Sequence, residues 1–514
     1  MRATLAVSRC VTAVLALLVF TPAHAAPEGQ MTWAVHFTIA PTWFDPAEHS
    51  GVITPLLPYY ALHDALVKPM PGAPMSPSLA ESWIASRDGL SYDFVLRRNV
   101  TFHNGEVVTA EDVKFSFERY RGVAATLLHE RVAAVDVVDP HRVRFRLKEP
   151  WPDFLTFYAT PATGAAWIVP KKYLEKVGDA GFKKAPIGAG PYRFVSFNPG
   201  VEMVLEAYEG YWRKTPTVKR LVFRMVPDES TRLAMLKRGE VDIAHALRGP
   251  LGEEVRRTSG LRLLAAPSVS AGTFWVSFTG EPWDPKSPWH DRRVRLAASL
   301  AIDRQAISQA ETLGFSKVSS STIPSSFEFA WPAPPIPYDP ERARKLLAEA
   351  GYPNGFDAGD YTCDASFSDL AEAVVNYLKA VGIRTRLRPL ERAAYFNQLR
   401  EKKVRHLLQG VDGGLGNAAT RIERNMVSRS PFAFGSYPEI DDLAAQQARE
   451  TDRKKREALL HQIQKIAYER VMFIPVWEFV QLHGVGPRVE EPGLGLVEYM
   501  PFTAPYEDVR LRRP

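Results

Sequence analysis

The spacing of apolar and polar residues predicts short strands and amphipathic helices that alternate along the chain. Apolar and polar residues roughly alternate from 92 to 98, which is typical of a half-buried strand. Asn104-Gly105 follows, a dipeptide that favours a tight turn. Thr109 then stands where its hydroxyl can cap a helix, with acidic residues in the first helical turn. Residues 78–120 are therefore predicted to form strand, turn and helix in succession.

Similar end signals predict elements elsewhere. Aspartates that can cap helices open the segments 228–238, 291–301, 303 onwards and 339–351, and residues 439–471 read as one or two long amphipathic helices. Short strands are predicted at 143–147, 190–197, 203–207, 221–226, 273–278 and 383–389. Because helices and strands are interspersed without a long run of either, the pattern favours α/β or α+β lobes.

The first 25 residues have the pattern of a secretory signal peptide. Arg2 and Arg9 precede the apolar run 11–20, which ends near the small residues Ala23-His24-Ala25. A run of about ten residues is too short to cross a bilayer, which needs about twenty. A buried first helix is the alternative. We expect an exported protein that is not inserted in the membrane.

The amino-acid composition further limits the class of protein. The chain has 514 residues, of which 46% are hydrophobic and 24% charged, as in ordinary globular proteins of several domains. Once the signal is removed, Cys363 is the single cysteine, so an internal disulfide is excluded. A net charge of +6 without a long basic block does not suggest nucleic acid as a partner. The densest basic cluster, 453–456, is interpreted as the solvated face of a helix.

Catalytic and metal-binding motifs are missing from the sequence. There is no HExxH, G-x-S-x-G, GxxxxGK[ST] or paired CxxC. Gly188-Ala189-Gly190 is followed by Pro191 and a strand, so it is interpreted as a turn and not as a dinucleotide loop. His103 lacks further ligands at metal-binding spacing and is interpreted as structural. We expect no enzyme activity, no metal and no cofactor.

Pairs of aromatic residues recur far apart in the sequence, at 43–44, 59–60, 274–275 and 477–479. In a strand, successive side chains point to opposite faces, so one of a pair can fill a core while the other faces a cleft. Aromatic side chains suit small-ligand sites because they bury much area with few rotatable bonds. Plain core packing is the alternative for each pair.

Several strings taken together resemble a known family. They include residues 78–120, IGAGPYRF at 187–194, VRLAASLAIDRQAI at 294–307 and YDPERARKLLAEAGYPNGF at 338–356. Shorter matches lie at 170–174, 208–212, 226–244, 381–395 and 474–477. In this order they resemble the family 5 extracellular solute-binding proteins, the dipeptide, oligopeptide and nickel receptors of ABC importers.

The resemblance implies a two-lobed α/β fold, that of a type II (cluster C) periplasmic binding protein with an extra inserted domain. Carried over, residues 26–50, 185–272 and 480–514 form lobe I, residues 51–184 the inserted domain and residues 273–479 lobe II. The implied function is that of a monomeric periplasmic component, which captures a peptide or peptide-like solute between its lobes and delivers it to an ABC permease. An exported hydrolase, or a periplasmic chaperone or receptor without import, is the alternative.

Peptide-binding members resemble one another in a G-W-x-G-D loop, whose aspartate pairs with the amino group of the peptide. Here Val411 stands at the tryptophan position and Gly414 at the aspartate position, although Asp412 is near. Arg421 and Arg424, just downstream, are candidates for an anionic ligand, with exposed helix arginines as the alternative. The predicted ligand contacts are Trp43, Phe44, Tyr60, Trp275, Asp412 and Trp477.

Overall fold

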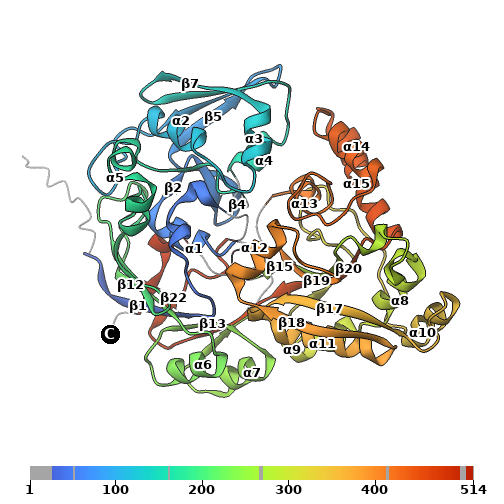
Figure 1. Ribbon diagram of the computed structural model, residues 1–514. Coiled ribbons are helices and arrows are strands. Elements are labelled where there is room, and N and C mark those ends of the chain that lie inside the picture. Colours follow the sequence, from blue (N-terminus) through green and yellow to red (C-terminus); the bar gives the residue numbers. More distant parts are fainter. Residues whose placement is uncertain are drawn as a thin grey trace, which may run out of the picture.

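Two large β-sheets organise the protein, one in each half (Figure 1). The computed structural model describes residues 26–49, 53–159, 163–265, 270–412, 416–497, 500 and 505–512. The predicted signal peptide lies outside the described residues. The mixed α/β class that the sequence predicts is confirmed, since helices cover both sheets.

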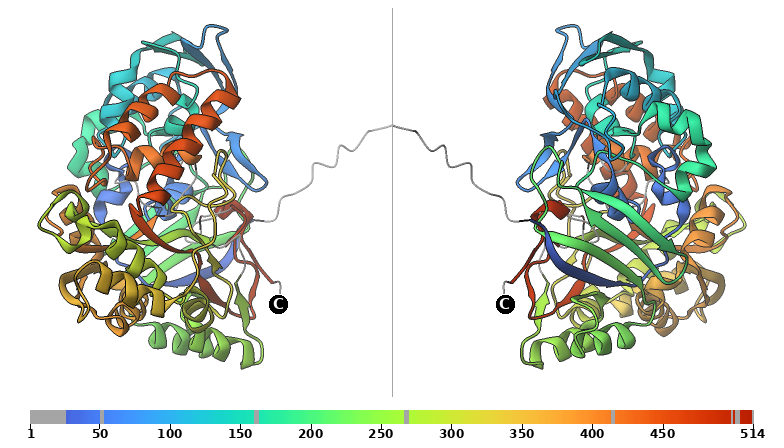
Figure 2. Two further views of the ribbon diagram at one scale, coloured as in Figure 1. Left: turned by 90° about the vertical axis from the view of Figure 1, so that its right-hand side faces the viewer. Right: turned by 90° about the vertical axis from the view of Figure 1, so that its left-hand side faces the viewer.

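The first sheet has seven strands in the order β10-β11-β12-β1-β13-β21-β14. Its strands are β1 (Glu28–Val35), β10 (Tyr192–Asn198), β11 (Glu202–Ala207), β12 (Val218–Met225), β13 (Ile243–Leu247), β14 (Arg262–Leu264) and β21 (Leu482–Val485). β1 runs parallel to β12 and β13, and the right view of Figure 2 shows it beside the strands that follow residue 190. The helices of this half are α1 (Leu56–Leu62), α6 (Glu229–Lys237) and α7 (Gly249–Arg257).

The second sheet has six strands in the order β16-β20-β15-β19-β17-β18. They are β15 (Ser270–Phe278), β16 (Lys317–Val318), β17 (Phe356–Asp364), β18 (Ile383–Leu390), β19 (Leu407–Asp412) and β20 (Phe473–Val480). The helices of this half are α8 (Arg292–Leu300), α9 (Arg304–Thr312), α10 (Pro340–Glu349), α11 (Ser368–Ala380), α12 (Arg392–Arg400), α13 (Ala418–Asn425), α14 (Pro438–Gln447) and α15 (Arg453–Glu469).

A four-stranded sheet lies beyond the first one, in the order β5-β6-β8-β7. Its strands are β5 (Ala80–Ala85), β6 (Ser91–Leu96), β7 (Val132–Asp139) and β8 (Arg142–Leu147), and its helices are α2 (Ala110–Glu118), α3 (Ala125–Arg131), α4 (Phe154–Ala159) and α5 (Lys171–Lys184). Short ladders join β2 (Asp64–Ala65) to β9 (Trp167–Ile168), β3 (Val67–Met70) to β4 (Ala73–Pro77), and β22 (Val489–Glu491) to β23 (Arg510–Leu511).

The hydrophobic clusters show which sheets share one core. One hydrophobic cluster runs from Trp33 and Phe223 in the seven-stranded sheet to Phe94 and Phe145 in the four-stranded sheet. The second half has clusters of its own, for example the one around Tyr361. Because a continuous core resists shear, the four-stranded region is expected to move with the first sheet and not with the second.

Along the chain, β14 of the first sheet is followed by β15 of the second sheet, with residues 266–269 between them outside the described residues, and β20 of the second sheet is followed by β21 of the first. β15 and β20 are neighbours and pair antiparallel inside the second sheet. A connection of two adjacent segments is the usual form of a hinge. The three segments that build the seven-stranded sheet fall within the ranges predicted for lobe I, and the exact domain boundaries stay a prediction.

The capping residues seen in the sequence mark the starts of several helices correctly. Asp228, Asp291, Asp303 and Asp339 each cap the helix that the sequence predicts, by accepting a backbone N–H in its first turn. The segment 439–471 forms two helices, because Asp452 caps the second one. At Thr109 the Asp112 carboxylate accepts both the backbone N–H and the hydroxyl, at 2.9 Å each.

The turn at 188–190 is structural, as predicted. The ring of His103 lies 2.9 Å from the Gly190 carbonyl oxygen, and the Gly188 N–H donates to its other nitrogen at 3.4 Å. Burial lowers the pKa of His103 to about 3, so the ring is neutral at pH 7. A Cβ on Gly188 would lie 1.9 Å from the Leu62 carbonyl oxygen, so only glycine fits.

Candidate functional site

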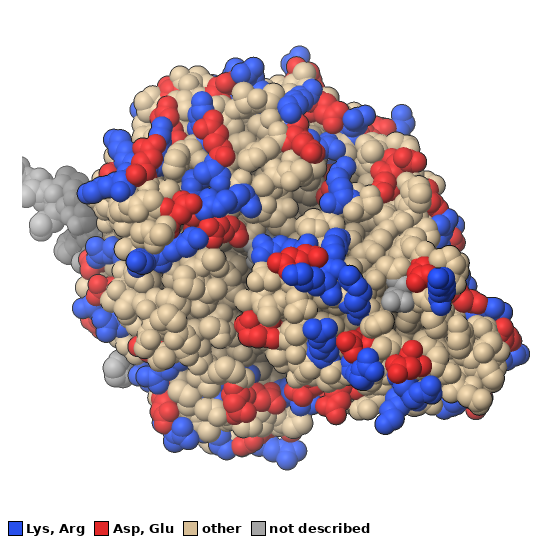
Figure 3. Space-filling model, in the orientation of Figure 1, with Lys and Arg blue, Asp and Glu red and all other residues tan. Residues whose placement is uncertain are grey.

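Two small adjoining pockets lie at the carboxyl end of β19, and both are lined by Tyr395, Phe396, Val411 and Asp412. Ile53, which precedes α1 on the other side of the molecule, lines the first of them. In Figure 3, Lys and Arg side chains gather near the middle of the face shown, over the region of α12. The pockets therefore lie where the two halves meet.

A buried charge cluster forms one wall of these pockets. Arg421 and Arg424 both pair with Oδ2 of Asp412, Arg424 through Nε at 3.1 Å, and the Asn425 amide donates to the same oxygen at 3.1 Å. Burial alone would raise the pKa of Asp412, but the two guanidinium charges outweigh it and hold the pKa below its ordinary value. Asp412 is therefore ionised at pH 7.

Arg421 and Arg424 are not the exposed helix arginines of the alternative interpretation. Their side chains are 4% and 17% exposed, because α13 turns them towards β19. The Arg424 guanidinium also lies 3.9 Å from the ring centre of Phe432. Stacking of this kind fixes the plane of the guanidinium.

Arg392, the first residue of α12, forms the other charged wall. It donates to Asp364 Oδ2 at 2.5 Å and to the Thr54 hydroxyl at 2.7 Å. Thr54 precedes α1, so this bond joins the two halves of the molecule. The Arg392 Nε atom is buried without a hydrogen-bond partner in the described part of the chain.

Gln409 supplies a buried acceptor to the first pocket. Its side-chain N–H donates to the Phe367 carbonyl oxygen at 3.3 Å, which fixes the orientation of the amide. Its Oε1 atom is buried and meets no hydrogen-bond donor among the residues that the structure describes. Leaving such an oxygen unpaired is costly, so an N–H donor placed there by a ligand would be favoured.

A larger cavity, of about 510 Å³, lies between the halves on another flank. It is lined by the β3–β4 hairpin and Thr156 on one side, Phe327 and Asn417 on the other, and Leu496 and Val497 near the C-terminus. Sites for small molecules typically measure about 300–1,000 Å³ and are mostly apolar. This cavity has the required size and position.

A buried ion pair also connects the two halves. Asp153, just before α4, pairs with Arg456 of α15 and accepts from the Asn417 amide at 2.9 Å. Arg456 is 7% exposed, so the prediction that residues 453–456 form a solvated face is wrong for it. Its neighbour Arg453 is exposed and reaches Glu328 at 3.1 Å.

The predicted ligand contacts separate into two groups. Trp275 and Asp412 line the pockets, and their role in binding stays a prediction. Phe44, Tyr60 and Trp477 are at most 1% exposed and lie in hydrophobic cores, which favours packing over ligand contact. Trp43 is half-buried against Phe37. The pairing of aromatics could not separate core from cleft, because both environments select large apolar side chains.

Sequence reasoning missed Arg392, Gln409, Asp153 and Arg456. A single polar residue in a strand or helix carries no local mark of what it meets across a cleft. Asn417, which caps α13, belongs to the loop 410–417, which stands where peptide-binding members have the G-W-x-G-D loop. Gly413 and Gly414 of that loop lie outside the described residues.

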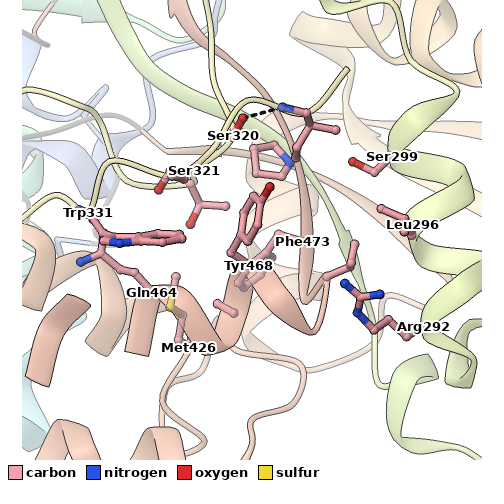
Figure 4. A pocket seen from close by; sticks show the side chains of 16 residues that line it. Arg292, Leu296, Ser299, Ser320, Ser321, Trp331, Met426, Gln464, Tyr468 and Phe473 are labelled. Atoms are coloured by element: carbon pink, nitrogen blue, oxygen red, sulfur yellow. Dashed lines mark hydrogen bonds between the residues drawn. The ribbon is translucent and has the colours of Figure 1, made fainter. Parts of the chain in front are cut away.

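Another cavity lies inside the second half and not between the halves (Figure 4). Trp331, Gln464 and Tyr468 line one side, and Leu296 and Ser299 of α8 the other. The Ile336 N–H donates to the Ser320 hydroxyl at 3.1 Å across its rim. Because every lining residue belongs to one lobe, lobe closure does not gate this cavity.

Among the described residues, no three His, Cys, Asp or Glu side chains stand close enough to hold a metal ion. None of the helices that the structure describes has the length and apolar character needed to cross a membrane.

Two lobes joined by two adjacent segments, with pockets at their meeting surface, define a bilobal solute-binding protein. Residues 74–425 match the family described as "Bacterial extracellular solute-binding proteins, family 5 Middle". The chain belongs to this family, as the resemblance predicts.

Named relatives agree with this assignment. The chain is 30% identical over 417 residues to the glutathione-binding protein GsiB of Escherichia coli K12, covering 77% of this chain and 79% of GsiB. Its fold matches the periplasmic binding protein DppA of Helicobacter pylori in complex with the peptide STSA, with a TM-score of 0.80, 22% identity and coverage of 94% and 98%. It also matches MoaA of A. tumefaciens R10 in complex with mannopinic acid, with a TM-score of 0.79, 24% identity and coverage of 95% and 100%.

Proposed function

We propose that the protein is the periplasmic substrate-binding component of an ABC importer, and that it captures a peptide or peptide-like solute between its lobes. The observation that carries this proposal is the similarity to a glutathione-binding protein over 77% of the chain. Glutathione is itself a small peptide. The interlobe cavity of about 510 Å³ supports a ligand of that size.

Binding in such a protein is coupled to the hinge. A ligand held by one lobe adds contacts to the other lobe only when the two approach, so it shifts the population towards the closed form. In this structure Asp153–Arg456 and Arg392–Thr54 join the two lobes, and we expect both contacts to be lost when the lobes open. A permease that binds the closed form better than the open one then receives loaded protein selectively.

Thermal unfolding of the purified protein with a ligand panel tests this function. The panel holds glutathione, a pool of dipeptides, a pool of free amino acids and a pool of sugars. We expect stabilisation by glutathione or the dipeptides, by about 2.7 kcal/mol at a hundredfold excess over Kd. Stabilisation by sugars or amino acids alone would refute a peptide-like substrate.

The same samples address the hydrolase alternative. A binding protein returns its ligand unchanged, so mass spectrometry after long incubation should recover the dipeptides intact. Cleaved peptides, with a rate proportional to protein concentration, would establish an enzyme instead.

A further inference from the structure

The cavity inside the second lobe is larger than either pocket at the end of β19. It measures about 90 Å³, against about 40 Å³ and about 20 Å³ for those pockets. In liquid water one molecule takes up about 30 Å³, so the cavity has room for about three waters or for one molecule of about five heavy atoms. Protein interiors leave few voids larger than a single water, which makes this cavity a candidate binding site.

Most of the cavity walls are apolar. The apolar side chains that form them are Leu296, Met426, Ala467, Val471, Phe473 and Pro475. The rings of Trp331 and Tyr468 lie edge to face beside the cavity, with their centres 5.5 Å apart (Figure 4). An apolar group placed between these walls would contact carbon on most sides, which favours a ligand with an apolar body.

Hydroxyl groups gather on one side of the cavity. The Ser320 oxygen accepts the Ile336 N–H at 3.1 Å, and the Ser321 oxygen accepts the Ile323 N–H at 3.0 Å. In the described part of the chain neither hydroxyl donates a hydrogen bond, and the Tyr468 hydroxyl makes none. Figure 4 shows the Tyr468 hydroxyl pointing towards the side where Ser320 lies. Because a hydroxyl can donate one hydrogen bond, this side of the cavity offers O–H donors to an acceptor.

The other polar groups of the cavity do not change this character. Both ends of the Gln464 amide are used, since Oε1 accepts the Trp331 N–H at 2.8 Å and Nε2 donates to two backbone carbonyl oxygens. Arg292 is exposed and donates from Nε to the Glu469 carbonyl oxygen, so its charge lies in solvent at the mouth of the cavity. This charge disfavours an ammonium group, and solvent screens its attraction for a carboxylate. A neutral ligand is therefore favoured.

We propose that this cavity binds a small neutral molecule of about five heavy atoms, with an apolar body and one oxygen that accepts a hydrogen bond from the Tyr468 hydroxyl. Short ketones and esters have this chemistry. The site is separate from the proposed interlobe site, because all its lining residues belong to the second lobe. Its occupation does not depend on the identity of the transported ligand.

Methionine methyl groups can locate a bound probe by nuclear magnetic resonance. Met426 lines the cavity of the second lobe, whereas Met70 and Met75 line the interlobe cavity. The full-length protein, isotopically labelled at its methionine methyl groups, is titrated with butanone, and Met426→Leu, Met70→Leu and Met75→Leu assign the three signals. We expect a saturable shift of the Met426 signal in the millimolar range, with the signals of Met70 and Met75 unchanged.

Tyr468→Phe tests the hydrogen bond, because it removes the hydroxyl and keeps the ring. It should weaken the binding of butanone by about three- to tenfold, as expected for loss of one hydrogen bond. Isopentane, which has a methyl group in place of the oxygen, should bind Tyr468→Phe and wild type within about twofold of each other. Tyr338→Phe is the matched control, because Tyr338 is 47% exposed and does not line the cavity.

Ala467→Leu tests the location, because the larger side chain fills the cavity. It should abolish the shift of the Met426 signal with both probes. Ala458→Leu is the matched control, because Ala458 lies on the same helix but is exposed. Far-UV circular dichroism checks that the variants fold. Should Ala467→Leu fail to fold, the titrations of wild type and Tyr468→Phe still decide the proposal.

An unshifted Met426 signal with both probes would overturn the proposal, and so would butanone binding that persists in folded Ala467→Leu. Equal binding of butanone to Tyr468→Phe and wild type would overturn the assigned hydrogen bond. Isobutyrate, an anion of similar size, should leave the Met426 signal unshifted, and binding as tight as that of butanone would overturn the neutral class. These outcomes leave the proposed function untouched, since it concerns the cavity beside Met70 and Met75.

Discussion

Asp412 and Asp153 are both buried aspartates paired with arginine, but their partners come from different places. Arg421, Arg424 and Asn425 belong to the same lobe as Asp412. Asp153 meets Arg456 and Asn417 across the boundary between the lobes. The pKa of Asp412 is lowered, whereas burial raises the pKa of Asp153 despite the Arg456 charge.

The difference shows which charges are fixed and which depend on closure. The partners of Asp412 among the described residues all lie in its own lobe, so we expect the Asp412 pairs to persist when the lobes move apart. The Asp153 pair requires that the start of α15 lies against the region before α4, as it does in this structure. We expect the Asp412 cluster to shape the predicted site, and the Asp153 pair to act as a latch that favours the closed form.

The largest effect is expected from Asp412→Asn. Two buried guanidinium groups would lose their counter-charge, and breaking a buried pair on one side costs about 3–5 kcal/mol. Urea unfolding of the protein measures the change. The control Asp136→Asn breaks an exposed pair with Arg146 and should leave stability nearly unchanged. Equal stability of the two variants would contradict the account of the cluster.

A smaller effect, on binding, is expected from Asp153→Asn. The variant keeps the shape of the side chain but leaves the buried Arg456 guanidinium without a counter-charge when the lobes are closed, so the closed form becomes less favourable. We expect about tenfold weaker ligand binding, which corresponds to about 1.4 kcal/mol. Glu149→Gln is the control, since its pair with Arg449 also crosses the lobes but is far less buried, with side chains 33% and 67% exposed. Unchanged affinity in Asp153→Asn would show that the pair is no latch.

The smallest effect is a pH dependence of opposite sign at the two sites. The contribution of Asp412 is present above its ordinary pKa and is lost as the pH falls through the lowered value. The contribution of Asp153 is fully present below its ordinary pKa and is lost as the pH rises through the raised value. As the pH falls from about 6 to about 3, the difference in unfolding free energy between the wild-type protein and Asp412→Asn should shrink. The same difference for Asp153→Asn should grow. If both differences changed in the same direction with pH, the opposite pKa shifts assigned to Asp412 and Asp153 would be contradicted.

The elements that depend on interactions between residues close in sequence could be predicted from the sequence. Capping aspartates such as Asp228 and Asp339 act on backbone groups a few residues away, so the helix starts follow directly. Asp153 and Arg456 lie 303 positions apart and meet only in the folded protein. Gln409 looks like any polar residue in a strand. The fold was therefore predictable from local patterns and resemblance, whereas the partners across the cleft were not.

Closure of the two lobes on a ligand can be followed as a change in the distance between them. Val138 of β7 and Tyr338, just before α10, are each 47% exposed and lie in opposite parts of the molecule (Figure 1). Both can be changed to cysteine for fluorescent labelling. Cys363 is buried, and burial raises the pKa of its thiol to about 12, so it should not react. Saturating dipeptides should shorten the distance between the two labels in energy-transfer measurements. An unchanged distance, in the presence of calorimetrically proven binding, would contradict a hinged clamp.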